Sequence, residues 1–187
     1  MKDGFIRVAA ATPDIHVADP QYNSEQIIEL MEQGSARGVK VMAFPELCLT
    51  AYTCSDLFLQ ESLLREAKKE LKRILQASKS KDMILFVGMP WMHKGKLYNV
   101  AAVLNRGRIL GIVPKKHLPN YSEFYELRHF NPGMEKVEMT DWEGVQVPMG
   151  MNLLFACRTM PELVLAAELC EDVWVPCPPS ISHALAG

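Results

Sequence analysis

Two short apolar runs near the start of the chain, each closed by a proline, limit the possible folds more than any other feature. The first run covers 5–11 (FIRVAAA) and ends before Pro13, and the second covers 39–44 (VKVMAF) and ends at Pro45. Runs of this kind are typical of strands that are buried on both faces of a sheet. With a helix between them, they predict a strand, helix, strand crossover.

Helix signals fill the space between the two runs and return after them. Asn23 and Gln26 have the spacing of a capping box, and Gly38 supplies a left-handed stop before the second run. A second helix is predicted at 61–77, where apolar residues recur at helical spacing and charged residues occupy the other faces. The first part of the chain therefore alternates strands with helices.

The following segment reads as consecutive hairpins. Strands are predicted at 83–87, 97–104 and 108–113. Turns at Lys94-Gly95 and Arg106-Gly107 join them. A long loop follows at 115–137, and long loops in compact domains are usually functional. These elements predict an α/β fold with a mixed sheet covered by helices.

Composition narrows the class of protein. The 187 residues include 20 Lys and Arg against 22 Asp and Glu, with 49% hydrophobic residues. This balance predicts one globular domain over residues 1–187, and it lacks the basic excess that nucleic-acid binding requires. The longest uncharged stretch, 173–187, contains Pro176, Pro178 and Pro179 and cannot form a membrane helix. We therefore expect neither a nucleic-acid partner nor a membrane partner.

The first residues and the cysteines indicate the cellular compartment and whether a metal site is present. The first ten residues lack the pattern of a secretory signal, and the five cysteines form no CxxC pair. The histidines show no HExxH spacing. We expect a cytoplasmic protein without a metal site, in which four cysteines are spectators: Cys48, Cys54, Cys157 and Cys177.

Three predicted element ends carry reactive side chains: Glu46, Lys115 and Cys170. Such ends tend to converge on a ligand crevice in α/β sheets. A thiol nucleophile, a carboxylate that accepts its proton and an ammonium that stabilises an oxyanion form a complete set for acyl transfer. Taken singly, each residue also has a bland interpretation: Cys170 as a small buried hydrophobe, Glu46 as part of a solvated loop, and Lys115 with Lys116 as a surface pair.

The words around these residues carry a family resemblance. FPELCLTAYTCSDLF, KKHLPNYSEFYELRHF and ELCEDVWVPCPPS resemble, in order, the glutamate, lysine and cysteine motifs of the nitrilase (carbon-nitrogen hydrolase) superfamily. Within it, the words SDLF, LPNYSEFYE and CEDVWVP are most similar to glutaminase domains of glutamine-dependent NAD synthetases. The resemblance implies an α-β-β-α four-layer sandwich, incomplete at its C-terminus in this chain.

The resemblance also implies roles for the reactive residues. Glu46 would be the general base, and Cys170 would attack the side-chain amide of L-glutamine to form a thioester. Lys115 stands three residues before Leu118, as the family lysine does, so it is preferred over Lys116 for the oxyanion. The Lys115 cation should lower the pKa of the Cys170 thiol while Glu46 should raise it.

Three further residues are assigned by the same resemblance. The backbone N–H of Glu171 would complete the oxyanion hole, Tyr121 would contact glutamine, and Glu126 would brace the site. Ala51 stands where the family usually has glycine, which affects a turn but removes no reactive group.

The end of the sequence sets the partners that we expect. In the family the glutaminase domain continues further and precedes a synthetase domain that uses ATP and Mg to convert deamido-NAD to NAD, whereas this sequence stops at Gly187. We expect no cofactor in this chain, and a homo-oligomer or added partner that covers exposed sheet surface. Two alternatives are a stand-alone nitrilase-type amidase acting on another small amide and an inactive fragment that only binds or oligomerises.

Overall fold

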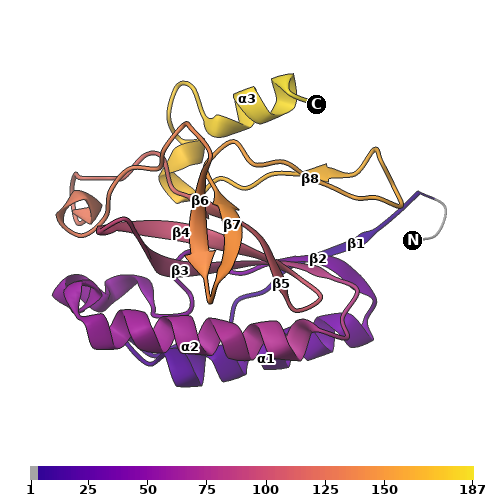
Figure 1. Cartoon of the computed structure of the whole chain (residues 1–187), viewed down its shortest axis with the longest axis horizontal. Coiled ribbons are helices and arrows are strands. Elements are labelled where there is room, and N and C mark those ends of the chain that lie inside the picture. The colour runs from indigo at the N-terminus through magenta and orange to yellow at the C-terminus, as the bar shows by residue number, and fades with distance from the viewer. Residues whose placement is uncertain (1–3) are drawn as a thin grey trace.

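The computed structural model describes residues 4–187, which form a mixed α/β fold (Figure 1). Three α-helices and three 3-10 helices are present in this range. The helical elements are α1 (Pro20–Ala36), η1 (Tyr52–Leu59), α2 (Glu61–Ser78), η2 (Glu126–Arg128), η3 (Cys170–Val173) and α3 (Pro179–Leu185). The strands are β1 (Arg7–Ala10), β2 (Val39–Ala43), β3 (Ile84–His93), β4 (Lys96–Asn105), β5 (Arg108–Pro114), β6 (Glu138–Trp142), β7 (Val145–Met149), β8 (Phe155–Ala156) and β9 (Val164–Leu165).

Seven strands form one sheet in the order β1-β2-β3-β4-β5-β7-β6. The first three strands are parallel, and β3, β4 and β5 form consecutive antiparallel pairs. The strand β7 then pairs in parallel with β5, and β6 closes the edge as a hairpin with β7. The predicted crossover and hairpins are therefore confirmed, and the sheet is mixed.

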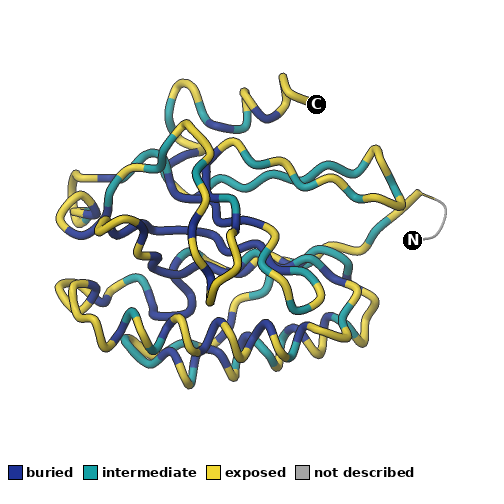
Figure 2. Tube along the Cα trace, viewed as in Figure 1, coloured by how far each residue is buried: buried dark blue, intermediate teal, exposed yellow. Residues whose placement is uncertain are grey.

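The two long helices cover one face of this sheet (Figure 1). The predicted helix at 61–77 is confirmed, because α2 spans Glu61–Ser78. Ile27, Met31, Leu71 and Ile74 are fully buried and join one core with sheet residues such as Leu85. Figure 2 shows buried turns on the sides of α1 and α2 that face the sheet and exposed turns on their outer sides. Burial of this apolar face is the main driving force for the helix layer.

The opposite face of the sheet carries the later part of the chain. A second sheet contains only β8 and β9, and α3 lies beyond it in Figure 1. Leu169 and half-buried Phe155 pack against Val103 and Val113 of the main sheet. The layers therefore follow the expected order of helices, sheet, sheet and helix, with a second sheet of two short strands among residues 4–187.

The predicted start of the first helix is wrong. The helix α1 begins at Pro20, and Asp19 is its N-cap, because the Asp19 side chain accepts a hydrogen bond from the Tyr22 N–H at 3.1 Å. Asn23 is fully buried instead, where its amide donates to the carbonyls of His16 and Leu49. These tertiary contacts outweigh the local capping pattern.

Three strand predictions also need correction. Neither β1 nor β2 is buried on both faces, since Val8 of β1 is 63% exposed and Ala43 of β2 is also exposed. Among residues 4–187, β1 lies at the edge of the sheet beside β2. The strand predicted at 83–87 extends further, because β3 continues past Val87 to His93. Glycine and proline usually interrupt a strand, but β3 runs through both Gly88 and Pro90. The β6–β7 hairpin was not predicted.

Candidate active site

Glu46, Lys115 and Cys170 come from three different elements and lie in one place. Glu46 follows β2, Lys115 follows β5, and Cys170 begins η3. The Lys115 Nζ lies 2.7 Å from the Glu46 Oε1. Glu46 and Cys170 both line a cavity of about 450 Å³ between the main sheet and the segment that leads from β9 to η3. The structure therefore brings together all three residues that the sequence singles out.

Lys115 is fully buried and has two carboxylate partners. Its Nζ donates to Glu46 Oε1 and to Glu126 Oε1, each at 2.7 Å, and Glu126 is only 4% exposed. Burial lowers the pKa of the Lys115 ammonium, but the attraction and hydrogen bonds of Glu46 and Glu126 outweigh this, so the pKa is raised. The pair of carboxylates keeps a cation inside the protein.

Two residues that the sequence analysis missed hold these carboxylates. The Asn99 amide donates to Glu46 Oε1 at 2.6 Å and lies 3.5 Å from Glu126 Oε2, while the Tyr52 hydroxyl donates to Glu126 Oε1 at 2.7 Å. Burial, followed by the contact with Glu126, raises the pKa of Tyr52. Asn99 gives one signal in the sequence: it is a polar side chain inside the apolar run LYNVAAVL, and such a residue needs a polar partner.

The turn that carries Glu46 lies directly against β3. A side chain at Gly88 would place its Cβ 2.4 Å from the Leu47 nitrogen and 2.5 Å from the Pro45 carbonyl oxygen. The Leu49 N–H also donates to the Gly88 carbonyl at 3.1 Å. Only glycine permits this approach of two backbones. Gly88 therefore sets the position of Glu46, although nothing in the sequence pattern marks it.

The Cys170 thiol is exposed to solvent on one side and faces charged groups on the other. Partial burial and then Glu46 raise the pKa of this thiol, Lys115 lowers it, and the net direction is upward. The predicted opposition between Glu46 and Lys115 is therefore present. The backbone of Cys170 has a φ of 45°, a conformation that L-residues other than Asn and Asp rarely adopt.

Tyr121 and Glu171 form one edge of the site. The Tyr121 hydroxyl donates to the Glu171 carboxylate at 2.9 Å, and this contact is the first cause of a raised Tyr121 pKa. Lys116 points elsewhere, with its Nζ 3.8 Å from Glu135.

The remaining cysteines lie in other surroundings. Cys48 is buried, and burial raises its pKa to about 12. Cys54 is also buried, with its sulfur 2.9 Å from the Thr50 carbonyl. Cys157 is half-buried and Cys177 is exposed. None of these four lines the cavity that holds Cys170.

Residues 4–187 contain neither a metal-ligand cluster nor a membrane-spanning helix. They contain no group of three or more His, Cys, Asp or Glu side chains arranged to hold a metal ion, and the expectation of a metal-free site stays a prediction. In the same range no helix has the length and apolar character that crossing a bilayer requires.

Comparison with known proteins places this geometry in a family context. Residues 7–183 match the family model described as carbon-nitrogen hydrolase. The glutamine-dependent NAD(+) synthetase of Mycobacterium bovis is 40% identical over 184 residues, which are 98% of this chain and 27% of that protein. The glutamine-dependent NAD(+) synthetase of Aquifex aeolicus is 33% identical over 183 residues, or 98% of this chain and 29% of that protein.

A solved structure agrees with these relatives. The crystal structure of a glutamine-dependent NAD(+) synthetase from Cytophaga hutchinsonii matches with a TM-score of 0.82 and 26% identity. The match covers 89% of this chain and 28% of that chain. This chain therefore spans less than one third of the length of these three NAD(+) synthetases.

Proposed function

This chain belongs to the carbon-nitrogen hydrolase family, and we propose that it hydrolyses the side-chain amide of glutamine through a thioester on Cys170. The ammonia would serve the ATP-dependent conversion of deamido-NAD to NAD by a synthetase domain. The observation that carries the proposal is the shared cavity of Cys170 and Glu46, with the buried ammonium of Lys115 2.7 Å from Glu46. The names of the relatives support the choice of glutamine.

The first half of the reaction forms the thioester. The thiol proton of Cys170 passes to Glu46 while the sulfur bonds to the amide carbon. The resulting oxyanion takes hydrogen bonds from the Lys115 Nζ and the Glu171 backbone N–H. The carbon–nitrogen bond then breaks, Glu46 returns the proton to the leaving nitrogen, and ammonia departs.

The second half releases glutamate. Glu46 takes a proton from water as the water oxygen attacks the thioester carbon, and Lys115 again stabilises the oxyanion. The carbon–sulfur bond breaks, and the proton held by Glu46 restores the thiol. One carboxylate thus serves both half-reactions, since it is free of the proton again after ammonia leaves.

Three further residues support these steps in the proposal. Glu126 would brace Lys115 as a second carboxylate beside Glu46, since both lie 2.7 Å from the same ammonium. Tyr121 and Glu171 are hydrogen-bonded to each other at the edge of the site, where they would contact the substrate. The Glu171 carboxylate has the charge that suits the α-ammonium group of glutamine.

A covalent label tests the proposal directly. We would incubate the chain with the diazoketone analogue of glutamine and map adducts by mass spectrometry, alongside ammonia release from glutamine. One adduct on Cys170 that disappears in Lys115→Ala and Glu46→Ala is the expected result. Cys177→Ser is the matched control, because Cys177 is also exposed. Labelling spread over several cysteines, or none at all, would contradict the proposal.

We also propose that the chain forms a homo-oligomer. The two edge strands carry exposed apolar side chains, with Val8 of β1 at 63% and Met139 of β6 at 50% exposed. Association would remove such groups from water. Light scattering over a range of concentrations tests this, and a monomer at all concentrations would contradict it.

A further inference from the structure

One more carboxylate lies at the site and takes no part in the steps above. Asp172 is two residues after Cys170 and only 1% exposed. Its Oδ1 accepts hydrogen bonds from the backbone N–H groups of His117 at 2.7 Å and Lys116 at 3.1 Å. Its Oδ2 accepts from the Leu169 N–H at 3.1 Å. A single side chain therefore joins the backbone after Lys115 to the backbone before Cys170.

The two joined segments differ in how firmly the rest of the fold holds them. The Lys115 N–H donates to the Asn99 carbonyl of β4 at 2.9 Å, and the Lys115 carbonyl accepts from the Gly133 N–H at 2.7 Å, so backbone contacts on both sides fix this residue. Cys170 has a left-handed backbone that must be imposed by its surroundings. The Asp172 N–H donates to the Leu169 carbonyl at 3.0 Å, which closes a ring with the Leu169 contact.

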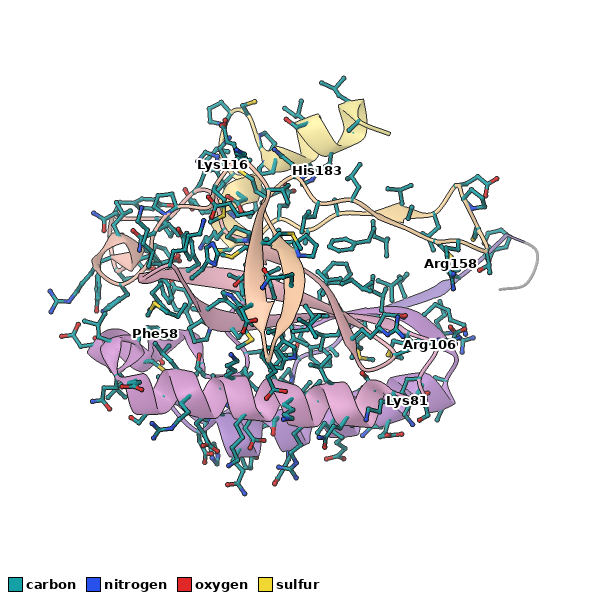
Figure 3. All side chains as sticks on the ribbon, viewed as in Figure 1. Phe58, Lys81, Arg106, Lys116, Arg158 and His183 are labelled. Atoms are coloured by element: carbon teal, nitrogen blue, oxygen red, sulfur yellow. The ribbon has the colours of Figure 1, made fainter. Side chains whose placement is uncertain are left out.

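The placement of these segments agrees with the contacts. In Figure 3, Lys116 and His183 lie on the same side of the molecule, away from the two long helices. The partners of Asp172 are backbone N–H groups, so its contacts set where the two chain segments lie.

We propose that Asp172 is a positioning residue that holds the Cys170 turn at its working distance from Lys115 and Glu46. The proposal rests on the proposed function, since it concerns the same site. A carboxylate is suited to this task because its two oxygens can accept hydrogen bonds from opposite sides. Loss of Asp172 should let the turn relax and move the thiol away from both charged groups.

The test measures the electrostatic coupling between Cys170 and Glu46, not stability. Alkylation of Cys170 by iodoacetamide is followed against pH, with each cysteine peptide read separately by mass spectrometry. Because Glu46 raises the pKa of the Cys170 thiol, Glu46→Gln should increase the alkylation rate at pH 8 by roughly threefold. When Asp172→Ala is already present, adding Glu46→Gln should change the alkylation rate of Cys170 by less than about 1.5-fold.

Two further variants make the test specific. Asp172→Asn keeps the size of the side chain but can accept on one side only, so it should also reduce the effect of Glu46→Gln. If Asp172→Ala does not fold, the measurement is made with Asp172→Asn instead. Glu70→Gln is the matched control, because Glu70 is 3% exposed and accepts a hydrogen bond from Ser24 far from the site. In that background the effect of Glu46→Gln should be unchanged.

The outcomes separate the two proposals. An effect of Glu46→Gln that is equally large with and without Asp172 would overturn the role of Asp172 alone. No effect of Glu46→Gln in the otherwise unchanged chain would instead contradict the coupled site on which the proposed function rests. The alkylation rates of Cys170 with and without Asp172 are measured in the absence of glutamine. They can therefore be compared even if the chain does not hydrolyse glutamine.

Discussion

The ammonium of Lys115 lies 2.7 Å from a carboxylate oxygen of Glu46, although 69 residues separate the two in the sequence. The strands β2 and β5, which they follow, are separated in the sheet by β3 and β4. One parallel pair, β2 with β3, followed by two antiparallel pairs, β3 with β4 and β4 with β5, makes β2 and β5 run in the same direction. Their carboxyl ends therefore meet at one edge of the sheet, which is where ligand sites form in such folds.

Removal of the buried cation should damage both stability and activity. Lys115→Met leaves the Glu46 and Glu126 carboxylates facing each other without a counter-charge, and breaking a buried ion pair in this way costs about 3–5 kcal/mol. Urea unfolding measures the loss, and ammonia release should fall to background. Lys116→Met, whose side chain is partly exposed, should cost no more than about 0.5 kcal/mol. Equal losses in the two variants would contradict the buried ion-pair network.

A methyl group at Gly88 should displace the turn that carries Glu46. The Gly88→Ala side chain would meet backbone atoms at 2.4 and 2.5 Å, which cannot move without shifting the turn. We expect a loss of about 1–3 kcal/mol together with loss of Cys170 labelling. Gly111→Ala is the control, since its nearest contact, at 2.7 Å, is the flexible end of Leu153. Normal labelling in Gly88→Ala would show that the turn is free to move.

The backbone at Ala51 should favour glycine. Ala51 has φ 71° and ψ 154°, a region that is populated almost only by glycine, and it is 4% exposed. Relief of this strain predicts that Ala51→Gly raises the free energy of unfolding by about 1 kcal/mol. Ala77→Gly, within α2, should instead lower it by about 1 kcal/mol. Thermal and urea unfolding compare the two, and destabilisation by both would rule out strain at Ala51.

Glu138 should contribute to stability only above acidic pH. Hydrogen bonds from Lys94 and then His93 lower its pKa from 4.5 to about 2. The folded value lies below the unfolded one, so the contribution is present above 4.5 and is lost as the pH falls towards 2. Glu138→Gln should therefore melt at a lower temperature than the parent at pH 7, with the difference shrinking below pH 4.5.

The control for this pH dependence is Glu135→Gln, because Glu135 is 80% exposed and 3.8 Å from Lys116. Its melting temperature should stay close to that of the parent across the same range. A difference between Glu138→Gln and the parent that persists unchanged at pH 2.5 would show that the ionised carboxylate is not the source of the stability.

Local signals in the sequence were sufficient for much of the framework. The helix α2 was predicted to within one residue of its end because apolar side chains recur along one face. The turns at Lys94-Gly95 and Arg106-Gly107 were predicted because positive φ angles at these pairs suit glycine, and all four residues have them. In contrast, β6 and β7 escaped prediction. In β6 the apolar Met139 is exposed and the polar Thr140 is buried, and in β7 Pro148 argues against a strand.

The sequence alone also identified Glu46, Lys115 and Cys170 as candidates, because each stands at the end of a predicted element within a contiguous motif that resembles one of the nitrilase superfamily. Only the tertiary structure revealed the contacts of Asn99 with Glu46, of Gly88 with the turn that carries Glu46, and of Asp172 with the backbone on either side of the site. These contacts join residues that are distant in the sequence, and the only local trace of them is the polar Asn99 inside an apolar run. A reactive group has recognisable chemistry in any setting, whereas a supporting group acquires its role only when the folded chain brings its partners within hydrogen-bonding distance.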